Sequence, residues 1–229
     1  MAKNFGDIQT SVYSWLGKEN PPGTPDTNAI PLATVKDLIN KSQDDICEEC
    51  DWTWTETNQP VTILAGQTSI AFPQSLLRLF QVRYTLPDGG VVILRPFTDP
   101  AGMLEAYHAS DEDDDESLQP ISDPDYPLAF NPWGHNLNIE CPAITDLTFN
   151  VYGNFRLPEL SADADTNFIV GAHWFLLLMR VLAKSSLFGF EDERVPIWAA
   201  TYQEELGKLK SLDASLRNSA TYLDTSEPG

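Results

Sequence analysis

Apolar residues at the start of the chain recur at three- and four-residue steps, the spacing of one face of a helix. The first such series is Phe5, Ile8, Val12 and Trp15. The stretch "GKENPPGTPDTN" interrupts it, and Pro31 then stands where a first helical turn accepts proline. The second series is Val35, Ile39, Ser42 and Ile46. The pattern predicts a short helix followed by a second helix over about residues 31–50.

From Trp52 the pattern changes to short alternating runs between turn residues, which is typical of β-strands. In "VTILAGQTSIAF", two apolar runs flank Ala65, Gly66 and Gln67, which predicts a β-hairpin. Further strand-like runs are "VVILRP", "YPLAF", "LNIE" and "LTFNVYGNFRL". Residues 52–158 are therefore predicted to form a compact antiparallel β region, interrupted by a short helix at "DPAGMLEAYHAS" and by the acidic run "DEDDDE".

Helical spacing returns after "LPELSADADTN". The segment "FIVGAHWFLLLMRVLAKSSLF" is apolar on nearly all sides, apart from a polar stripe at His173, Arg180 and Lys184, so it predicts a buried helix. A last helix is expected to begin near Val195 and Pro196. Its apolar face is predicted at Trp198, Tyr202, Leu206, Leu209, Leu212 and Leu216. The tail "NSATYLDTSEPG" has too little apolar content to pack on itself and is expected to be extended unless a partner orders it.

These elements predict an α+β fold in which helices from both ends of the chain form one bundle around an inserted antiparallel β domain. The expected division is residues 1–51 for the N-terminal helices, 52–158 for the β domain and 159–217 for the C-terminal helices. An extended tail is expected over residues 218–229.

Composition narrows the classes of function. The chain has 229 residues, of which 42% are hydrophobic, enough for a sizeable core. No stretch reaches the length of an apolar membrane span, and the N-terminal segment lacks the apolar centre of a secretory signal, so synthesis in a cytoplasm is expected. The odd number of cysteines, three, favours reduced thiols. The formal charge of −20 argues against gripping a phosphate backbone, although it would let DNA slide past.

No motif in the chain supports catalysis or metal binding. Cys47 and Cys50 in "CEEC" have half of a zinc-site spacing, without a second pair of ligands. The acidic series that begins at Asp163 has Phe168 where a calcium loop requires glycine, so helix capping explains it better. No serine or cysteine stands near a histidine in a nucleophile motif. We therefore expect no catalytic residue, no metal and no cofactor.

Two other features allow alternative interpretations. Trp52 and Trp54 lie two apart on a predicted strand and could form a stacking platform for bases or sugars, but burial in the core is the stronger interpretation. The acidic run could be a solvated loop or the repulsive lining of a channel. It consists of Asp111, Glu112, Asp113, Asp114, Asp115 and Glu116.

The order of several motifs is more informative than any single residue. The block "WTWTETNQPVTILAGQTSIAFPQSLLRLFQVRY" is followed by "VVILRPFTDP", by "LTFNVYGNFRLPELSADADTN" and by "YQEELGKLKSLDA". This succession, over about residues 30–216, resembles the head-to-tail adaptor proteins of tailed bacteriophages. In short-tailed phages the family is also called head completion or tail tubular protein A-like.

The resemblance implies a structural virion protein that is not an enzyme. Copies of such a protein form a ring, commonly of twelve, beneath the portal at the neck between head and tail. The ring extends the DNA channel, lets double-stranded DNA through without specific binding, and presents a platform to the tail or nozzle protein. A C-terminal segment docks on portal subunits, a role in which Tyr222 and Leu223 are the candidates here. Heterologous contacts between copies, a virion location after synthesis in the host cytoplasm, and the absence of a membrane partner are expected.

Within this frame, "FPQSLLRLFQVRY" is predicted to hinge the β domain against the bundle. Pro73 would turn the chain, Leu76, Leu77 and Leu79 would fill the gap, and a strand would follow. Arg78 and Arg83 are expected to meet carboxylates of the same or a neighbouring subunit. Two alternatives to the adaptor remain: a subunit of the tail tube or nozzle, and a virion protein that binds or hydrolyses carbohydrate with its aromatic residues.

Overall fold

The structure, a computed structural model, describes residues 3–17, 30–86, 88–103, 126–188 and 192–224. It is an α+β protein, as predicted, and it divides into two compact units. One unit, here called the helical unit, consists of residues 1–55 and 156–229. The other, the β unit, consists of residues 56–155. The chain passes from one unit to the other between Thr55 and Glu56 and again between Phe155 and Arg156.

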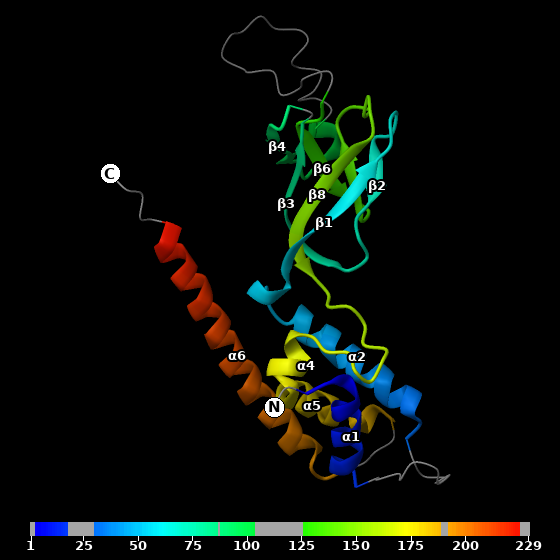
Figure 1. Ribbon diagram of the computed structural model, residues 1–229, viewed down its shortest axis with the longest axis vertical. Helices are drawn as coiled ribbons and strands as arrows, with labels where there is room; N and C mark the ends of the chain where they lie inside the picture. The colour runs from blue at the N-terminus through cyan, green and yellow to red at the C-terminus, as the bar shows by residue number, and fades with distance from the viewer. Residues whose placement is uncertain (1–2, 18–29, 87, 104–125, 189–191, 225–229) are drawn as a thin grey trace, which may run out of the picture. The chain divides into compact units, whose positions relative to one another are not determined.

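The helical unit is organised around one apolar helix, α5 (Trp174–Ala183), whose residues Leu176 to Met179, Val181 and Leu182 are buried. Figure 1 shows the helices around it: α1 (Phe5–Trp15), α2 (Leu32–Glu48), α4 (Phe168–Ala172) and α6 (Val195–Asp224). Each of these four contacts α5. The short 3-10 helices η1 (Thr53–Thr55) and η3 (Ser185–Phe188) complete the unit. No helix in the described part of the chain has the length and apolar content to cross a bilayer.

The predicted helices at both ends of the chain are confirmed, with one interruption. The segment from Phe168 onward is not one helix, because His173 leaves helical geometry at φ −124° and ψ 31° and separates α4 from α5. The predicted polar stripe is accounted for by partners. Arg180 and Lys184 both form ion pairs with Asp45 of α2.

The β unit contains two four-stranded sheets. Sheet A has the order β1 (Glu56–Ile63), β8 (Leu147–Phe155), β3 (Leu76–Thr85) and β4 (Val91–Ile93). Sheet B has the order β2 (Ser69–Ala71), β7 (Asn136–Ile139), β6 (Ala129–Trp133) and β5 (Arg95–Pro96). Residues of both sheets share one hydrophobic cluster, with Val82, Phe149 and Val151 from sheet A and Phe130 and Leu137 from sheet B.

The predicted hairpin around Gly66 is wrong. The strand β1 pairs with β8 and β2 pairs with β7, so the connecting loop crosses from one sheet to the other. Distant partners hold that loop: the backbone N–H of Ala65 donates to the Asp146 carboxylate, and the N–H of Gly66 donates to the carbonyl of Ala143. The β unit is also not wholly antiparallel, because β5 and β6 pair in parallel.

The predicted extended tail over residues 218–229 is corrected as well. The helix α6 continues to Asp224, so Tyr222 and Leu223 lie in a helix. Extending an existing helix adds a hydrogen bond for each residue fixed, whereas starting a new one is costly, which explains why a weakly apolar segment remains helical. Residues 225–229 lie outside the described residues.

Gly153 permits the closest approach between two strands of sheet A, which makes it a test of the pairing of β3 with β8. A Cβ atom at this position would lie 2.1 Å from the carbonyl oxygen of Arg78, where the β3 register is irregular. We predict that Gly153→Ala lowers the free energy of unfolding by about 1–3 kcal/mol, the usual cost of forcing extra atoms into a packed site.

Gly207 on α6 is the matched control, because a Cβ atom there would meet nothing within 4 Å. Gly207→Ala should raise the free energy of unfolding by about 0.5–1 kcal/mol through helix propensity. Denaturant unfolding followed by circular dichroism measures both variants. Equal stability of Gly153→Ala and the wild type would contradict the strand packing described here.

Candidate functional site

The described residues contain no cluster of three or more histidine, cysteine or carboxylate side chains that could hold a metal ion. No disulfide bond joins Cys47, Cys50 and Cys141. Burial raises the pKa of the Cys47 thiol to about 11, which keeps it protonated and unreactive at neutral pH. The surfaces that could contact other proteins are the remaining candidates for a functional site.

The residues predicted as a hinge all lie in the β unit. Pro73 precedes β3, and the side chains of Leu76 and Leu79 pack against the hydrophobic cluster of this unit. The hinge role of Pro73, Leu76, Leu77 and Leu79 stays a prediction. The acidic run at 111–116 lies outside the described residues.

The helix α6 offers the clearest candidate surface. Its predicted apolar face is confirmed at Trp198, Tyr202, Leu206 and Leu209, all of which are buried. The prediction is wrong for Leu212 and Leu216, which are 48% and 55% exposed. The reason is the face of the helix: the buried series continues from Leu209 to Asp213, four residues on, so that Leu212 and Leu216 lie outside it.

Asp213 takes the buried position that follows Leu209 on α6, with only 4% of its surface exposed. Its Oδ1 atom accepts hydrogen bonds from the backbone N–H of Thr53, at 2.9 Å, and from the Thr53 hydroxyl, at 2.6 Å. Its Oδ2 atom accepts one from Nε of Arg217 at 3.1 Å, and Arg217 also donates to the carbonyl of Asp51. We call Asp51, Thr53, Asp213 and Arg217 the α6–η1 clamp, because they join α6 to η1.

The clamp sets the charge state of its carboxylate. Burial raises the pKa of Asp213, but the hydrogen bonds from Thr53 and Arg217 outweigh burial and hold the pKa below its usual value. The carboxylate is therefore ionised at neutral pH. Since Thr53 lies in η1, just before the chain leaves for β1, the clamp fixes α6 beside the crossing point between the units.

A second group of polar contacts joins the first half of α6 to α5 and α2. The guanidinium of Arg180 lies 4.9 Å from the ring centroid of Tyr202 on α6, and its Nε atom donates to Asp45 on α2 at 2.9 Å. Burial raises the pKa of Tyr202, so its hydroxyl stays neutral. Helices α2, α5 and α6 thus meet at one ion-paired and stacked contact.

The two tryptophans at the predicted helix-to-sheet junction belong to η1 and the turn before it, and not to a strand. Trp52 is fully buried and its Nε1 atom donates to the carbonyl of Ile46 at 2.6 Å. Trp54 stacks between Trp52 and Phe168, with ring centroids 5.6 Å and 5.0 Å away. Their faces are thus occupied inside the helical unit, as the core interpretation predicted.

The sequence model of the family described as "SU10 adaptor protein" matches residues 3–223. The chain belongs to the SU10 adaptor family. The predicted resemblance to bacteriophage head-to-tail adaptors is confirmed. No curated protein matches the chain.

The SU10 adaptor family is a structural family of bacteriophages and not a family of enzymes. We therefore expect the functional residues of this adaptor on surfaces that contact other proteins, and not in cavities. Sequence reasoning missed the α6–η1 clamp, although Asp213 and Arg217 have the four-residue spacing of a helical ion pair and Asp213 continues the buried series from Leu209.

The clamp generates a prediction on stability. We expect Asp213→Ala to lower the free energy of unfolding by about 2–4 kcal/mol, because it leaves buried donors of Thr53 without their acceptor. Glu204→Ala is the matched control on the same helix, since the Glu204–Lys208 ion pair is exposed to solvent and its loss should change the free energy of unfolding far less. Chemical unfolding at pH 7 compares the two.

The effect of Asp213→Ala should also depend on pH. A carboxylate with a lowered pKa contributes its stability above the pKa of the unfolded chain, and this contribution is lost as the pH falls through the folded-state pKa. The difference between wild type and Asp213→Ala should therefore shrink below about pH 4, the ordinary carboxyl range. A difference that does not change between pH 7 and pH 3 would contradict an ionised clamp.

Proposed function

We propose that this adaptor forms a ring that docks on the portal, extends the DNA channel and provides the platform on which the tail is attached. The match to the SU10 adaptor family over residues 3–223 carries the proposal. In this proposal the helical unit acts as a bundle that forms the ring wall, and the β unit is a domain inserted into it. The ring is a dodecamer located at the head-to-tail neck of the virion.

The second half of α6 is the proposed portal-docking element. Leu212 and Leu216 are exposed at four-residue spacing on a helix that continues to Asp224, and Tyr222 and Leu223 lie in its last turns. Apolar residues spaced in this way on one helix suit insertion into a groove of another protein. The α6–η1 clamp would hold this half of the helix in place for docking.

The charge of the chain suits a channel through which DNA must move. With 34 acidic and 14 basic residues, copies in a ring present an excess of carboxylates. Phosphate backbones are held by clusters of lysine and arginine, and an acidic wall repels them. In this proposal, double-stranded DNA passes through the ring during packaging and ejection without specific binding.

If α6 docks on the portal, substitution of its exposed leucines should weaken portal binding. We expect the double variant Leu212→Ser with Leu216→Ser to bind purified portal at least tenfold more weakly, equivalent to about 1.4 kcal/mol, because the apolar contact area is lost. Deletion of residues 218–229 should weaken binding in the same direction and leave the fold intact. Biolayer interferometry with immobilised portal measures the affinity, and circular dichroism confirms folding.

Ile197→Ser is the matched control for this experiment. Ile197 is also an exposed apolar residue of α6, at 63%, but it lies in the first turn of the helix. Its substitution should leave portal binding unchanged. Equal binding by the double variant and the Ile197 variant would remove the second half of α6 from the portal contact.

A further inference from the structure

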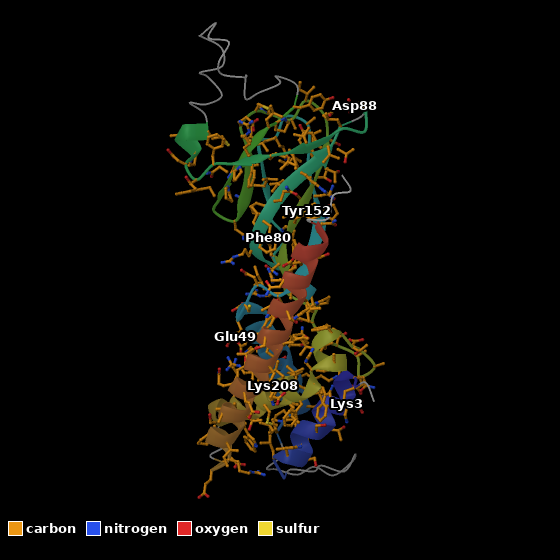
Figure 2. All side chains as sticks on the ribbon, turned by 90° about the vertical axis from the view of Figure 1, so that its left-hand side faces the viewer. Lys3, Glu49, Phe80, Asp88, Tyr152 and Lys208 are labelled. Carbon is orange, nitrogen blue, oxygen red and sulfur yellow. The ribbon has the colours of Figure 1, made fainter. Side chains whose placement is uncertain are left out.

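The outward face of sheet A carries a compact group of large side chains that do not belong to the hydrophobic cluster of the β unit. Phe80 on β3 is 48% exposed, and Figure 2 shows it close to Tyr152 on the neighbouring strand β8. The guanidinium carbon of Arg83 lies 4.1 Å from the ring centroid of Tyr152. We call Phe80, Arg83 and Tyr152 the sheet A patch.

The surroundings of the patch extend it on both sides. On β4, Val91 and Ile93 are 58% and 56% exposed, and Ile93 pairs directly with Arg83. On the side of β1, Asn58 donates to the Tyr152 hydroxyl at 3.3 Å. A groove of about 260 Å³ runs beside Phe80 and Tyr152, and Glu56, Thr57, Asn58 and Gly153 complete its lining.

The patch has the composition of a protein interface. Tyrosine, phenylalanine and arginine are enriched in the buried centres of interfaces, while lysine and carboxylates are depleted there. Stacking on Tyr152 holds the Arg83 guanidinium in one orientation before any partner arrives. This lowers the entropy that a contact would cost and leaves the N–H groups of the guanidinium available for a carboxylate.

The charge of Arg83 is unusual within this chain. Between positions 56 and 155 the sequence has no lysine, and its arginines are Arg78, Arg83 and Arg95. Elsewhere, intrachain ion pairs already engage Lys36, Arg156, Arg180, Lys184, Arg194, Lys208, Lys210 and Arg217. By contrast, no carboxylate from the described part of the chain forms an ion pair with Arg83.

We infer that the sheet A patch docks on an acidic surface of a second copy of this chain. Two copies that each carry a formal charge of −20 repel one another, and a contact in which one copy presents positive charge to the other offsets this repulsion. Arg83 would pair there with a carboxylate of the neighbour, while Phe80 and Tyr152 would bury apolar area around the pair.

The same charges determine the geometry of the contact. A two-fold contact of patch against patch would bring two arginines together, whereas patch against acidic surface joins different faces of the two copies. Such a heterologous contact repeats from copy to copy, and it gives a ring when the rotation between neighbouring copies closes. The inference thus rests on the proposed ring and assigns to it one of the two surfaces that neighbouring copies share.

Charge reversal at Arg83 tests the inference in the full-length protein. Arg83→Glu should raise the protein concentration needed for half-maximal assembly at least tenfold in sedimentation velocity, and Tyr152→Ala should act in the same direction. Arg95→Glu is the matched control, because it makes the same charge change at an exposed position on β5 of sheet B and should assemble as the wild type does. Arg83→Gln provides a milder variant, and circular dichroism confirms that all are folded.

The outcomes separate the two proposals. Rings of Arg83→Glu that form as readily as those of Arg95→Glu would overturn the sheet A contact and leave the proposed ring unaffected. A wild type that forms no ring, alone or with portal, would overturn both. In addition, p-benzoylphenylalanine at position 80 should cross-link to an acidic peptide of another copy in a mixture with portal. Cross-links to portal alone would assign the patch to that partner and overturn the inference.

Discussion

The burial of α5 is the constraint on which the helical unit depends. This helix is apolar on nearly every side, so water must be excluded from its whole circumference and no single neighbour can do so. The covering helices α1 and α2 come from the start of the chain, and α4 and α6 come from its last third. The two ends of the chain therefore fold together, and residues 56–155 form a unit of their own between them.

The length of α6 follows from a different balance. Along its first half, burial against α5 stabilises the helix, and farther on the α6–η1 clamp supplies the tertiary contact. The apolar residues Leu212 and Leu216 lie outside this buried face and are about half exposed. A helix that leaves apolar side chains exposed in this way is suited to a partner, which connects its packing to the proposed docking role.

The sequence patterns predicted which segments form helices and strands better than they predicted which of these segments pair or pack together. The periodic helices were found because each requires a face that repeats every three or four residues, and the motif order around "LAGQTSIAFPQSLLRL" led to the correct family. The hairpin failed because alternation shows that β1 and β2 are strands but not that β1 pairs with β8, far along the chain. Asp213 was missed because charged residues are rarely candidates for a buried position, and its partners Thr53 and Arg217 become evident only in three dimensions.

The central claim is that copies of this chain assemble into a closed ring that binds the portal. Electron microscopy of the purified protein, alone and mixed with portal, tests it most directly. The account predicts rings with rotational symmetry in at least one sample, twelve copies in each, seated on the portal in the mixture. Single copies in both samples, or open filaments that do not bind portal, would contradict it.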